Sequence, residues 1–366
     1  MSRRYTMWLS PTEQENAQTD MKREIKTIKT PIGDAVIIKF TNDAGASVTL
    51  SSLGAGILSV VVPDREGKLG EVALGYADPA SYFDDGPCMG KIPGRYANRI
   101  ARGLFFLNGK EYQLAVNNGP NALHGGPTGF QNRIWQVSML PTGVRFTYTS
   151  ADGEENYPGN LAVNADYHWN DHNILELHIT GWTDAPTPVN LTNHCYWNLR
   201  GKGSVLDHRL RLRASRFLVT DDTLIPAGEL AEVIGTPMDF LEPRRLGERI
   251  HEKFPALEYG KGYDSCWALD GWKKTWFIHD AAVLEDEESG RVLTVGTTQP
   301  GVQIYTGNWL KGSPASRDGK PYEDYDGVAI EMQAFPDSPN HPDFPNTILR
   351  PGERYDERIR FAFIVK

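Results

Sequence analysis

Short segments in which apolar and polar residues alternate run through most of the chain, and they predict β-strands. Successive side chains of a strand point to opposite faces, so a half-buried strand has a period of two. Segments of this kind, rich in β-branched residues and separated by turn formers, recur from residue 34 to the end. The clearest are Asp34–Phe40, Ser47–Leu53, Ile57–Val62, Val144–Thr149, Leu175–Thr180, Arg209–Arg213 and Ile359–Val365.

The connections between these segments favour an all-β fold built as one large antiparallel β-sandwich with long loops. Asn108-Gly109 lies between two strand-like runs and is a strong signal for a two-residue hairpin. Pro243–Ile250, with proline near its start, is a candidate for a short helix. Residues 1–28 are polar and predict an extension or a short surface helix, which leaves 29–366 as a single domain.

Composition narrows the functional classes. A net charge of -9 over 366 residues argues against a nucleic-acid partner, because phosphate binding requires a basic face. The sequence lacks any apolar run near the roughly 18 residues that span a bilayer, so we expect no membrane partner. Three scattered cysteines predict neither a disulfide framework nor a zinc site and favour a cytoplasmic location.

The stretch Pro188–Leu199 is unusually polar for a strand. Read as one, it puts a polar row on one face, while Trp197 falls on the other face and is expected in the core. The row consists of Asn190, Thr192, His194, Tyr196 and Asn198. Buried polar groups need partners, so this face should meet a cavity, water or a polar ligand such as a sugar.

Four further clusters combine polar and aromatic residues: Gly94–Ile100, Asn121–Gly126, Gly262–Trp267 and Gly327–Asn340. In the last of these, Glu331 lies opposite an apolar row, so it either faces solvent or belongs to a site. The proline-rich loop that follows, Phe335–Pro342, is expected to form a rigid pocket wall.

Single residues in these clusters have two interpretations each. His194 alone is compatible with a structural histidine, and His124 either approaches a ligand or belongs to a turn beside Gly125-Gly126. Arg99 either clamps a ligand or pairs with an acid, and Asp264 is either a buried acceptor or a charge at a strand edge. A Gly-x-Ser-x-Gly nucleophile elbow, a P-loop and a dinucleotide fingerprint do not occur in the sequence.

Taken in order, these motifs resemble those of the aldose 1-epimerase (galactose mutarotase) family. The resemblance runs from about Pro31 to the C-terminus. It also includes Glu155–Gly159, Leu224–Glu229, Pro300–Asn308 and Arg350–Glu353. Many motifs in register over most of the chain make the signal specific.

The resemblance implies a galactose mutarotase-like β-supersandwich that interconverts the α and β anomers of free hexoses such as glucose and galactose. It implies that Glu331 is the catalytic base and His194 the catalytic acid. The residues that it assigns to substrate binding are Asn98, Arg99, His124, Asp264 and Gln303. It implies an aldose as the small-molecule partner, no cofactor or metal, and a monomer or homodimer. One departure concerns Ser265-Cys266, where family members commonly have His-Asn.

Three other functions remain to be weighed. An epimerase of phosphorylated hexoses needs clustered cations, for which Lys91, Arg95 and Arg99 are the candidates. A carbohydrate-binding module needs no matched acid and base, so the presence of both Glu331 and His194 argues against it. A glycosidase usually pairs two carboxylates, whereas the best pair here is Glu331 with His194.

Overall fold

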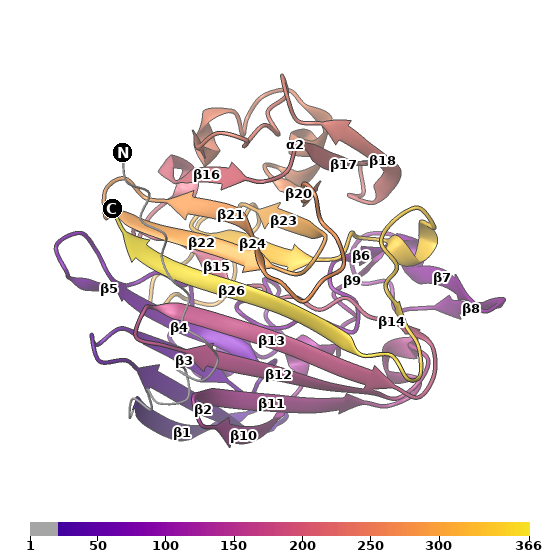
Figure 1. Cartoon of the computed structure of the whole chain (residues 1–366), viewed down its shortest axis with the longest axis horizontal. Helices are drawn as coiled ribbons and strands as arrows, with labels where there is room; N and C mark the ends of the chain where they lie inside the picture. Colours follow the sequence, from indigo (N-terminus) through magenta and orange to yellow (C-terminus); the bar gives the residue numbers. More distant parts are fainter. Residues whose placement is uncertain (1–20) are drawn as a thin grey trace.

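Antiparallel strands form three large sheets in the computed structural model, which describes residues 21–366 (Figure 1). The five-stranded sheet has the order β1 (Lys22–Thr30), β2 (Gly33–Thr41), β3 (Ser47–Ser51), β4 (Gly56–Pro63) and β5 (Leu69–Glu71). The nine-stranded sheet has the order β10 (Gln136–Leu140), β11 (Gly143–Ser150), β12 (Leu161–Trp169), β13 (Ile174–Thr183), β26 (Tyr355–Val365), β22 (Arg291–Thr297), β21 (His279–Glu285), β16 (Arg209–Leu212) and β19 (Arg244–Arg245). The six-stranded sheet has the order β15 (Tyr196–Trp197), β24 (Val328–Gln333), β23 (Gly301–Tyr305), β20 (Asp264–Ala268), β17 (Arg216–Thr220) and β18 (Pro226–Glu232).

Smaller elements connect and cap the sheets. Three two-stranded pairs join β6 (Arg99–Ile100) to β9 (Ala122–Leu123), β7 (Leu104–Leu107) to β8 (Lys110–Gln113), and β14 (Thr187–Pro188) to β25 (Ile348–Leu349). Short 3-10 turns cover 79–82, 101–103, 130–132, 154–156, 205–207, 246–248 and 338–340. Within residues 21–366, α2 (Pro255–Gly260) is the one α-helix, and no helix there has the length and apolarity to cross a membrane.

Side chains from all three large sheets share one core. The nine-stranded sheet lies in front of the other two in Figure 1, and residues such as Ile38, Leu177 and Ile330 meet between them without exposure to solvent. Trp197 is fully buried there, with its ring 5.1 Å from Phe361 and 5.4 Å from Phe363. The predictions of an all-β antiparallel fold and of a core position for Trp197 are therefore confirmed.

The alternating segments in the sequence match strands of the structure. The seven segments that we predicted correspond to β2, β3, β4, β11, β13, β16 and β26. Asn108 and Gly109 connect β7 to β8 with φ values of 52° and 77°. Positive φ at both residues is the geometry of a type I′ hairpin, which Asn-Gly favours.

Two local predictions are wrong. Pro243–Ile250 does not form an α-helix, because Arg244 and Arg245 pair with β16 at the end of the nine-stranded sheet and only a single 3-10 turn follows. Pro188–Leu199 is not a continuous strand either. It contains the end of β14 and the short β15, and between them the backbone bonds to neighbouring segments, as when Asn190 donates to the Arg95 carbonyl at 3.0 Å.

The first described strand begins inside the segment that we expected to be an extension. β1 pairs with β2 along its whole length, from Lys22 opposite Thr41 to Thr30 opposite Gly33. Its side chains are mostly exposed because it is the outer strand of its sheet, so its sequence lacks an apolar row. Residues 1–20 of the predicted extension lie outside the described residues.

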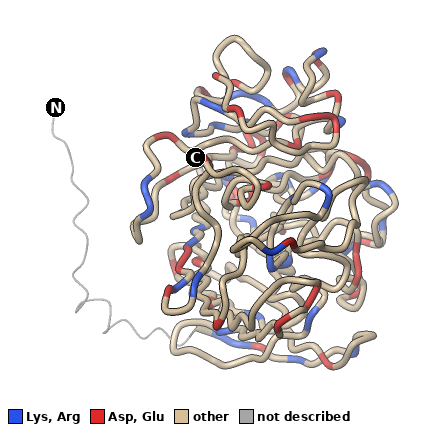
Figure 2. The backbone as a smooth tube through the Cα atoms, turned by 90° about the vertical axis from the view of Figure 1, so that its right-hand side faces the viewer, with Lys and Arg blue, Asp and Glu red and all other residues tan. Residues whose placement is uncertain are grey.

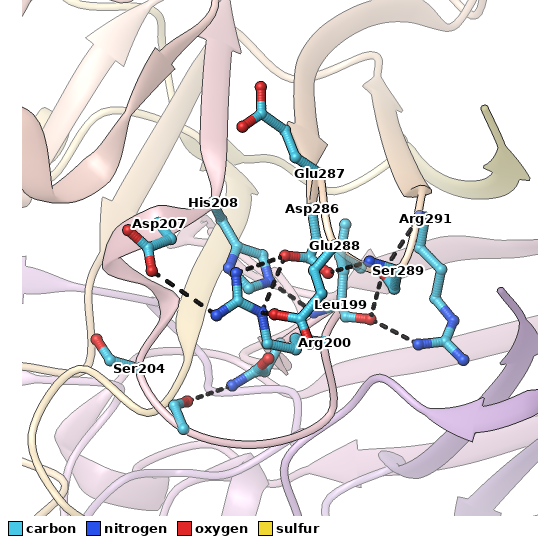
Figure 3. Close-up of polar contacts among 12 residues, drawn as sticks. Leu199, Arg200, Ser204, Asp207, His208, Asp286, Glu287, Glu288, Ser289 and Arg291 are labelled. Carbon is cyan, nitrogen blue, oxygen red and sulfur yellow. Dashed lines mark hydrogen bonds and ion pairs between the residues drawn. The ribbon is translucent and has the colours of Figure 1, made fainter. Parts of the chain in front are cut away.

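A buried polar cluster joins the ends of several strands away from the core (Figure 3). Asp286, 1% exposed, accepts hydrogen bonds from the Ser289 backbone at 2.8 Å and from Arg200 at 3.0 Å. Arg291 and Ser289 both donate to the Leu199 carbonyl, at 2.8 Å and 3.2 Å. The buried charges of this cluster are thus paired locally, as their desolvation requires. Elsewhere, basic and acidic residues are interspersed along the described backbone (Figure 2).

Trp197→Ala is expected to lower the free energy of unfolding by about 3–5 kcal/mol, because it opens a cavity among buried aromatic rings. Trp197→Phe should cost clearly less, since the indole nitrogen has no hydrogen-bond partner among the described residues and most of the ring contacts remain. Urea denaturation followed by circular dichroism measures both. Trp276→Ala, at a side chain 70% exposed, is the control and should stay within about 0.5 kcal/mol of the unaltered chain. Equal losses for Trp197→Ala and the control would contradict this account of the core.

Candidate active site

A cavity of about 900 Å³ opens beside the six-stranded sheet and gathers residues from distant parts of the chain. Its wall includes the loop 83–87, the segments 118–120 and 222–224, and the loop 309–314. The residues predicted from the sequence that line it are Asn98, Arg99, His124, His194, Asp264 and Glu331. The volume lies within the range of about 300–1,000 Å³ that is usual for small-molecule sites.

Glu331 and His194 meet in this cavity. The Nε2 atom of His194 lies 3.5 Å from Oε1 of Glu331, and both side chains are almost fully buried. Glu331 belongs to β24, whose neighbouring residues Ile330 and Met332 point into the main core. Because side chains alternate along a strand, Glu331 points to the opposite side, which is the cavity. The prediction that Glu331 opposes an apolar row is confirmed.

His194 is held by its backbone rather than by a long strand. Its N–H donates to the Lys91 carbonyl and its carbonyl accepts from the Gly90 N–H, both at 2.9 Å. Lys91 in turn forms a completely buried ion pair with Asp85, in the loop that lines the cavity. The segment that fixes the histidine is therefore anchored by a charge pair, and removing one partner would leave an uncompensated buried charge.

Burial shifts the pKa values of both groups toward their uncharged forms. It raises the pKa of the Glu331 carboxyl well above its ordinary range, and the nearby charge of Asp264 raises it further. Burial also lowers the pKa of the His194 imidazole to about 4. The arrangement of the two groups that burial favours therefore places a proton on the carboxyl group and leaves the imidazole neutral.

His124 presents a fixed donor beside His194. Its backbone is left-handed, with φ of 53°, and its Nδ1 accepts a hydrogen bond from the Asn98 N–H at 3.1 Å. Burial, followed by the charges of His194 and Arg99, holds the pKa of His124 well below its ordinary range. A neutral imidazole that accepts through Nδ1 carries its proton on Nε2. His124 thus occupies a turn and also lines the cavity.

Arg99, Asp264 and Gln303 form a hydrogen-bonded chain along one wall. Arg99 Nη2 donates to Asp264 Oδ2 at 3.2 Å, and Gln303 Nε2 donates to Asp264 Oδ1 at 2.6 Å. Arg99 also donates through Nη1 to Asn98 Oδ1 at 3.2 Å. Gln303 lies opposite Glu331 in the pairing of β23 with β24 and supports Asp264 from behind the lining. Arg99 therefore pairs with an acid and faces the cavity at once, and Asp264, with a side chain 12% exposed, is a partly buried acceptor at the first residue of β20.

The polar row of Pro188–Leu199 does not face the site as a row. His194 and Tyr196 line the cavity, whereas Asn190 donates to the Ala97 carbonyl at 3.1 Å and Asn198 donates to the Asp326 carbonyl at 2.8 Å. These amides satisfy backbone groups of neighbouring segments because the chain here lacks a continuous strand. The expectation that this whole face meets a cavity is therefore wrong for Asn190 and Asn198.

Several lining residues were not predicted. They include the aromatic residues Phe83, Tyr259, Tyr305 and Trp309. Trp309 is 63% exposed, and the Lys261 ammonium lies 4.4 Å from the centre of its ring. The sequence signal that could have identified Trp309 is its position directly after Gly307-Asn308, at the end of the Pro300–Asn308 motif.

Two other expectations about the wall are corrected. Lys91 forms an ion pair with Asp85, and Arg95 donates hydrogen bonds to the Pro158 carbonyl at 2.8 Å and to Ser150. These two cations therefore do not form a phosphate site with Arg99. The loop after β24 runs behind the Arg99 segment instead of forming the pocket wall, as shown by the 2.8 Å bond from the Asp337 N–H to the Arg99 carbonyl.

Ser265 and Cys266, which differ from the His-Asn pair common in the family, place small side chains next to Asp264. Ser265 pairs with Ile304, which lies in the main core, and Cys266 packs with Leu218, Phe335 and Phe344. Alternation along β20 puts Cys266 on the same face as Asp264. On this face the aspartate thus has Cys266 as an apolar neighbour in addition to Gln303, which pairs with Cys266 and donates to the carboxylate.

Comparisons with known proteins agree with this architecture. The family model described as aldose 1-epimerase matches residues 36–362. The chain is 42% identical to the galactose mutarotase of Bos taurus, over 92% of this chain and 96% of that protein, and 39% identical to the aldose 1-epimerase of Escherichia coli K12, over 90% and 95%.

Solved structures give the same result. A GalM/aldose epimerase homologue from C. elegans superposes with a TM-score of 0.83 at 31% identity, covering 90% of this chain and 99% of that one. Galactose 1-epimerase from Lactobacillus acidophilus gives 0.82 at 27% identity, covering 94% and 99%. The expected galactose mutarotase-like fold is therefore confirmed, and the chain belongs to the aldose 1-epimerase family.

Proposed function

We propose that this chain is an aldose 1-epimerase that interconverts the α and β anomers of free hexoses such as glucose and galactose. The observation that carries the proposal is the 3.5 Å approach of His194 Nε2 to Glu331 Oε1 inside a cavity lined by hydrogen-bonding groups. The high identity to proteins named galactose mutarotase and aldose 1-epimerase supports it.

The reaction opens and closes a hemiacetal. Glu331 as a carboxylate takes the proton from the hydroxyl on C1, while His194 as an imidazolium gives a proton to the ring oxygen. Both oxygens are bonded to C1, so two groups that lie close together can reach them simultaneously. The aldehyde then rotates about the C1–C2 bond, and the reverse transfers close the ring on its other face.

Burial of the pair favours the proton transfers of ring opening and opposes, to the same extent, those of ring closure. The opening step converts a carboxylate and an imidazolium into a carboxylic acid and a neutral imidazole, which are the forms that the buried site favours. General acid–base catalysis typically contributes about 10²–10⁴-fold, or roughly 3–5 kcal/mol of activation free energy. Proton transfer alone accounts for the chemistry, so the proposal includes no cofactor or metal.

The remaining predicted residues hold the sugar hydroxyls. Asp264 offers carboxylate oxygens as acceptors, and Arg99 and the Nε2–H of His124 offer donors. Asn98 orients Arg99, and Gln303 orients Asp264, through the hydrogen bonds described above. Fixed donors and acceptors suit a polyhydroxylated ring because each hydroxyl needs both kinds of partner.

The proposal also includes the domain organisation, the oligomeric state and the cellular location of the enzyme. The site draws on residues from Asn98 to Glu331 of one chain, which suits a single domain acting as a monomer or homodimer. Because β1 (Lys22–Thr30) belongs to the five-stranded sheet, this domain includes residues before 29. Cys88, Cys195 and Cys266 are buried free thiols, which suits a reducing compartment such as the cytoplasm.

Glu331→Gln and His194→Asn should each reduce the catalysed rate by on the order of 10²-fold or more, because each removes one of the two proton carriers. Polarimetry on freshly dissolved α-D-galactose and α-D-glucose measures the rate above the buffer background. Circular dichroism should show an unchanged fold. A near-normal rate in either variant would remove that residue from its assigned role.

The catalysed rate should follow a bell-shaped pH profile. The active pair carries one proton, so activity falls when a second proton binds and when the only one is lost. The acid limb should lie near pH 4, where the lowered pKa of His194 falls, and the basic limb well above the ordinary glutamate range. Background-corrected polarimetry between about pH 3 and 10 tests this, and an acid limb near the ordinary histidine value of about 6.5 would contradict it.

A further inference from the structure

The segment Tyr96–Ala101 carries two of the proposed sugar-binding residues but has little strand structure. Its strand β6 contains only Arg99 and Ile100, and they pair with the equally short β9. Asn98 has a left-handed backbone with φ of 65°. Hydrogen bonds from other parts of the chain must therefore fix the position of this segment.

Asn190 and His124 bond to Ala97 and Asn98, and the loop that follows β24, the strand that carries Glu331, bonds to the residues at the two ends of the segment. The Tyr96 hydroxyl donates to the Phe335 carbonyl at 2.9 Å and accepts from the Ser338 N–H at 3.2 Å. Tyr96 is almost completely buried, so these contacts exclude solvent.

Asp337 makes the central contacts of this loop. Its N–H donates to the Arg99 carbonyl at 2.8 Å, and its Oδ1 accepts from the Ala101 N–H at 3.0 Å. Oδ1 also accepts from Asn340 at 2.7 Å, while Oδ2 lies 3.3 Å from Nε2 of His341. Asp337 is 2% exposed, and it holds the backbone from the Arg99 carbonyl to the Ala101 N–H, directly after the Arg99 side chain.

We propose that Asp337 is a positioning residue, which sets the Arg99 guanidinium against Asp264 and so aligns the sugar-binding wall with Glu331. The inference rests on the proposed function. A carboxylate suits this role because its two oxygens accept several N–H groups at once, which a neutral side chain of the same size does less well. Asp337 lies outside the cavity lining, so it acts through Arg99 rather than on the sugar.

The backbone of Asp337 allows a direct test. Its φ of 57° is a left-handed conformation, which Gly, Asn and Asp adopt most readily. Asp337→Gly therefore removes the carboxylate without straining the chain. Asp337→Asn keeps a side-chain oxygen that can accept from the Ala101 N–H.

Asp337→Gly should raise KM for D-galactose by on the order of 10-fold while kcat falls by less than about 3-fold, because it loosens Arg99 but leaves both proton carriers in place. Asp337→Asn should restore KM to within about 3-fold of the original value. Tyr96→Phe removes the hydrogen bonds between the Tyr96 hydroxyl and the same loop, and it should raise KM by about 2–3-fold. This variant gives a test even if Asp337→Gly fails to fold.

Asp286→Gly is the matched control. It also removes a buried carboxylate that accepts a backbone N–H, but in the polar cluster of Figure 3, outside the lining of the cavity. It should lower the free energy of unfolding and leave KM unchanged. A KM increase in Asp286→Gly equal to that in Asp337→Gly would overturn the proposal, because it would reveal a general effect of destabilisation.

Calorimetric titration with D-galactose separates this inference from the proposed function. If the unaltered chain binds galactose but does not accelerate mutarotation, the proposed function fails, and the dissociation constants still test Asp337. Asp337→Gly should weaken binding by on the order of 10-fold. Values of both KM and the dissociation constant within about 2-fold of the original in Asp337→Gly would overturn the positioning role, and so would unchanged values in Tyr96→Phe as the only folded variant.

Discussion

The burial of Glu331 beside His194 is the interaction on which the rest of the structure depends. Two ionisable groups 3.5 Å apart and almost without solvent are costly to charge, so their surroundings decide where a proton resides. β24 supplies the carboxyl from one side, and the backbone of Gly90 and Lys91 fixes the imidazole from the other. The buried ion pair of Lys91 with Asp85 anchors the second of these supports.

The sequence predicts best those parts of the site that lie on strands. Glu331 and Gln303 lie on strands whose alternate residues enter the core, so the period of two assigns their side chains to one side. The same period identifies β2, β11, β13 and β26, and Asn108-Gly109 identifies a hairpin by its backbone conformation alone. The grouping of all seven site residues, by contrast, depended on the resemblance to a family, because long-range contacts leave no local pattern.

The failures have physical causes of their own. Asn190 and Asn198 seemed to extend the polar face around His194, but a polar side chain in a short sequence stretch does not reveal whether it meets a ligand or a backbone group. Both amides bond to carbonyls of distant segments. β1 was missed because an outer strand has no apolar row, and α2 was missed because its six residues are too few for a helical period to be visible.

The outer strand β1 also bears on how copies of the chain meet. One of its edges pairs with β2, and the opposite edge leaves main-chain groups unpaired within the described fold, a template that another strand would extend. Lys22, Arg23, Lys26 and Lys29 are distributed along this strand, and its other side chains are mostly exposed as well. Lys22 and Lys29 pair with Glu24 and Asp34, which leaves Arg23 and Lys26 to meet the same cations of a second copy that approached edge to edge, and to lose their hydration. The cations along the outer edge of β1 therefore oppose the addition of strands from further copies, which would lead to aggregates.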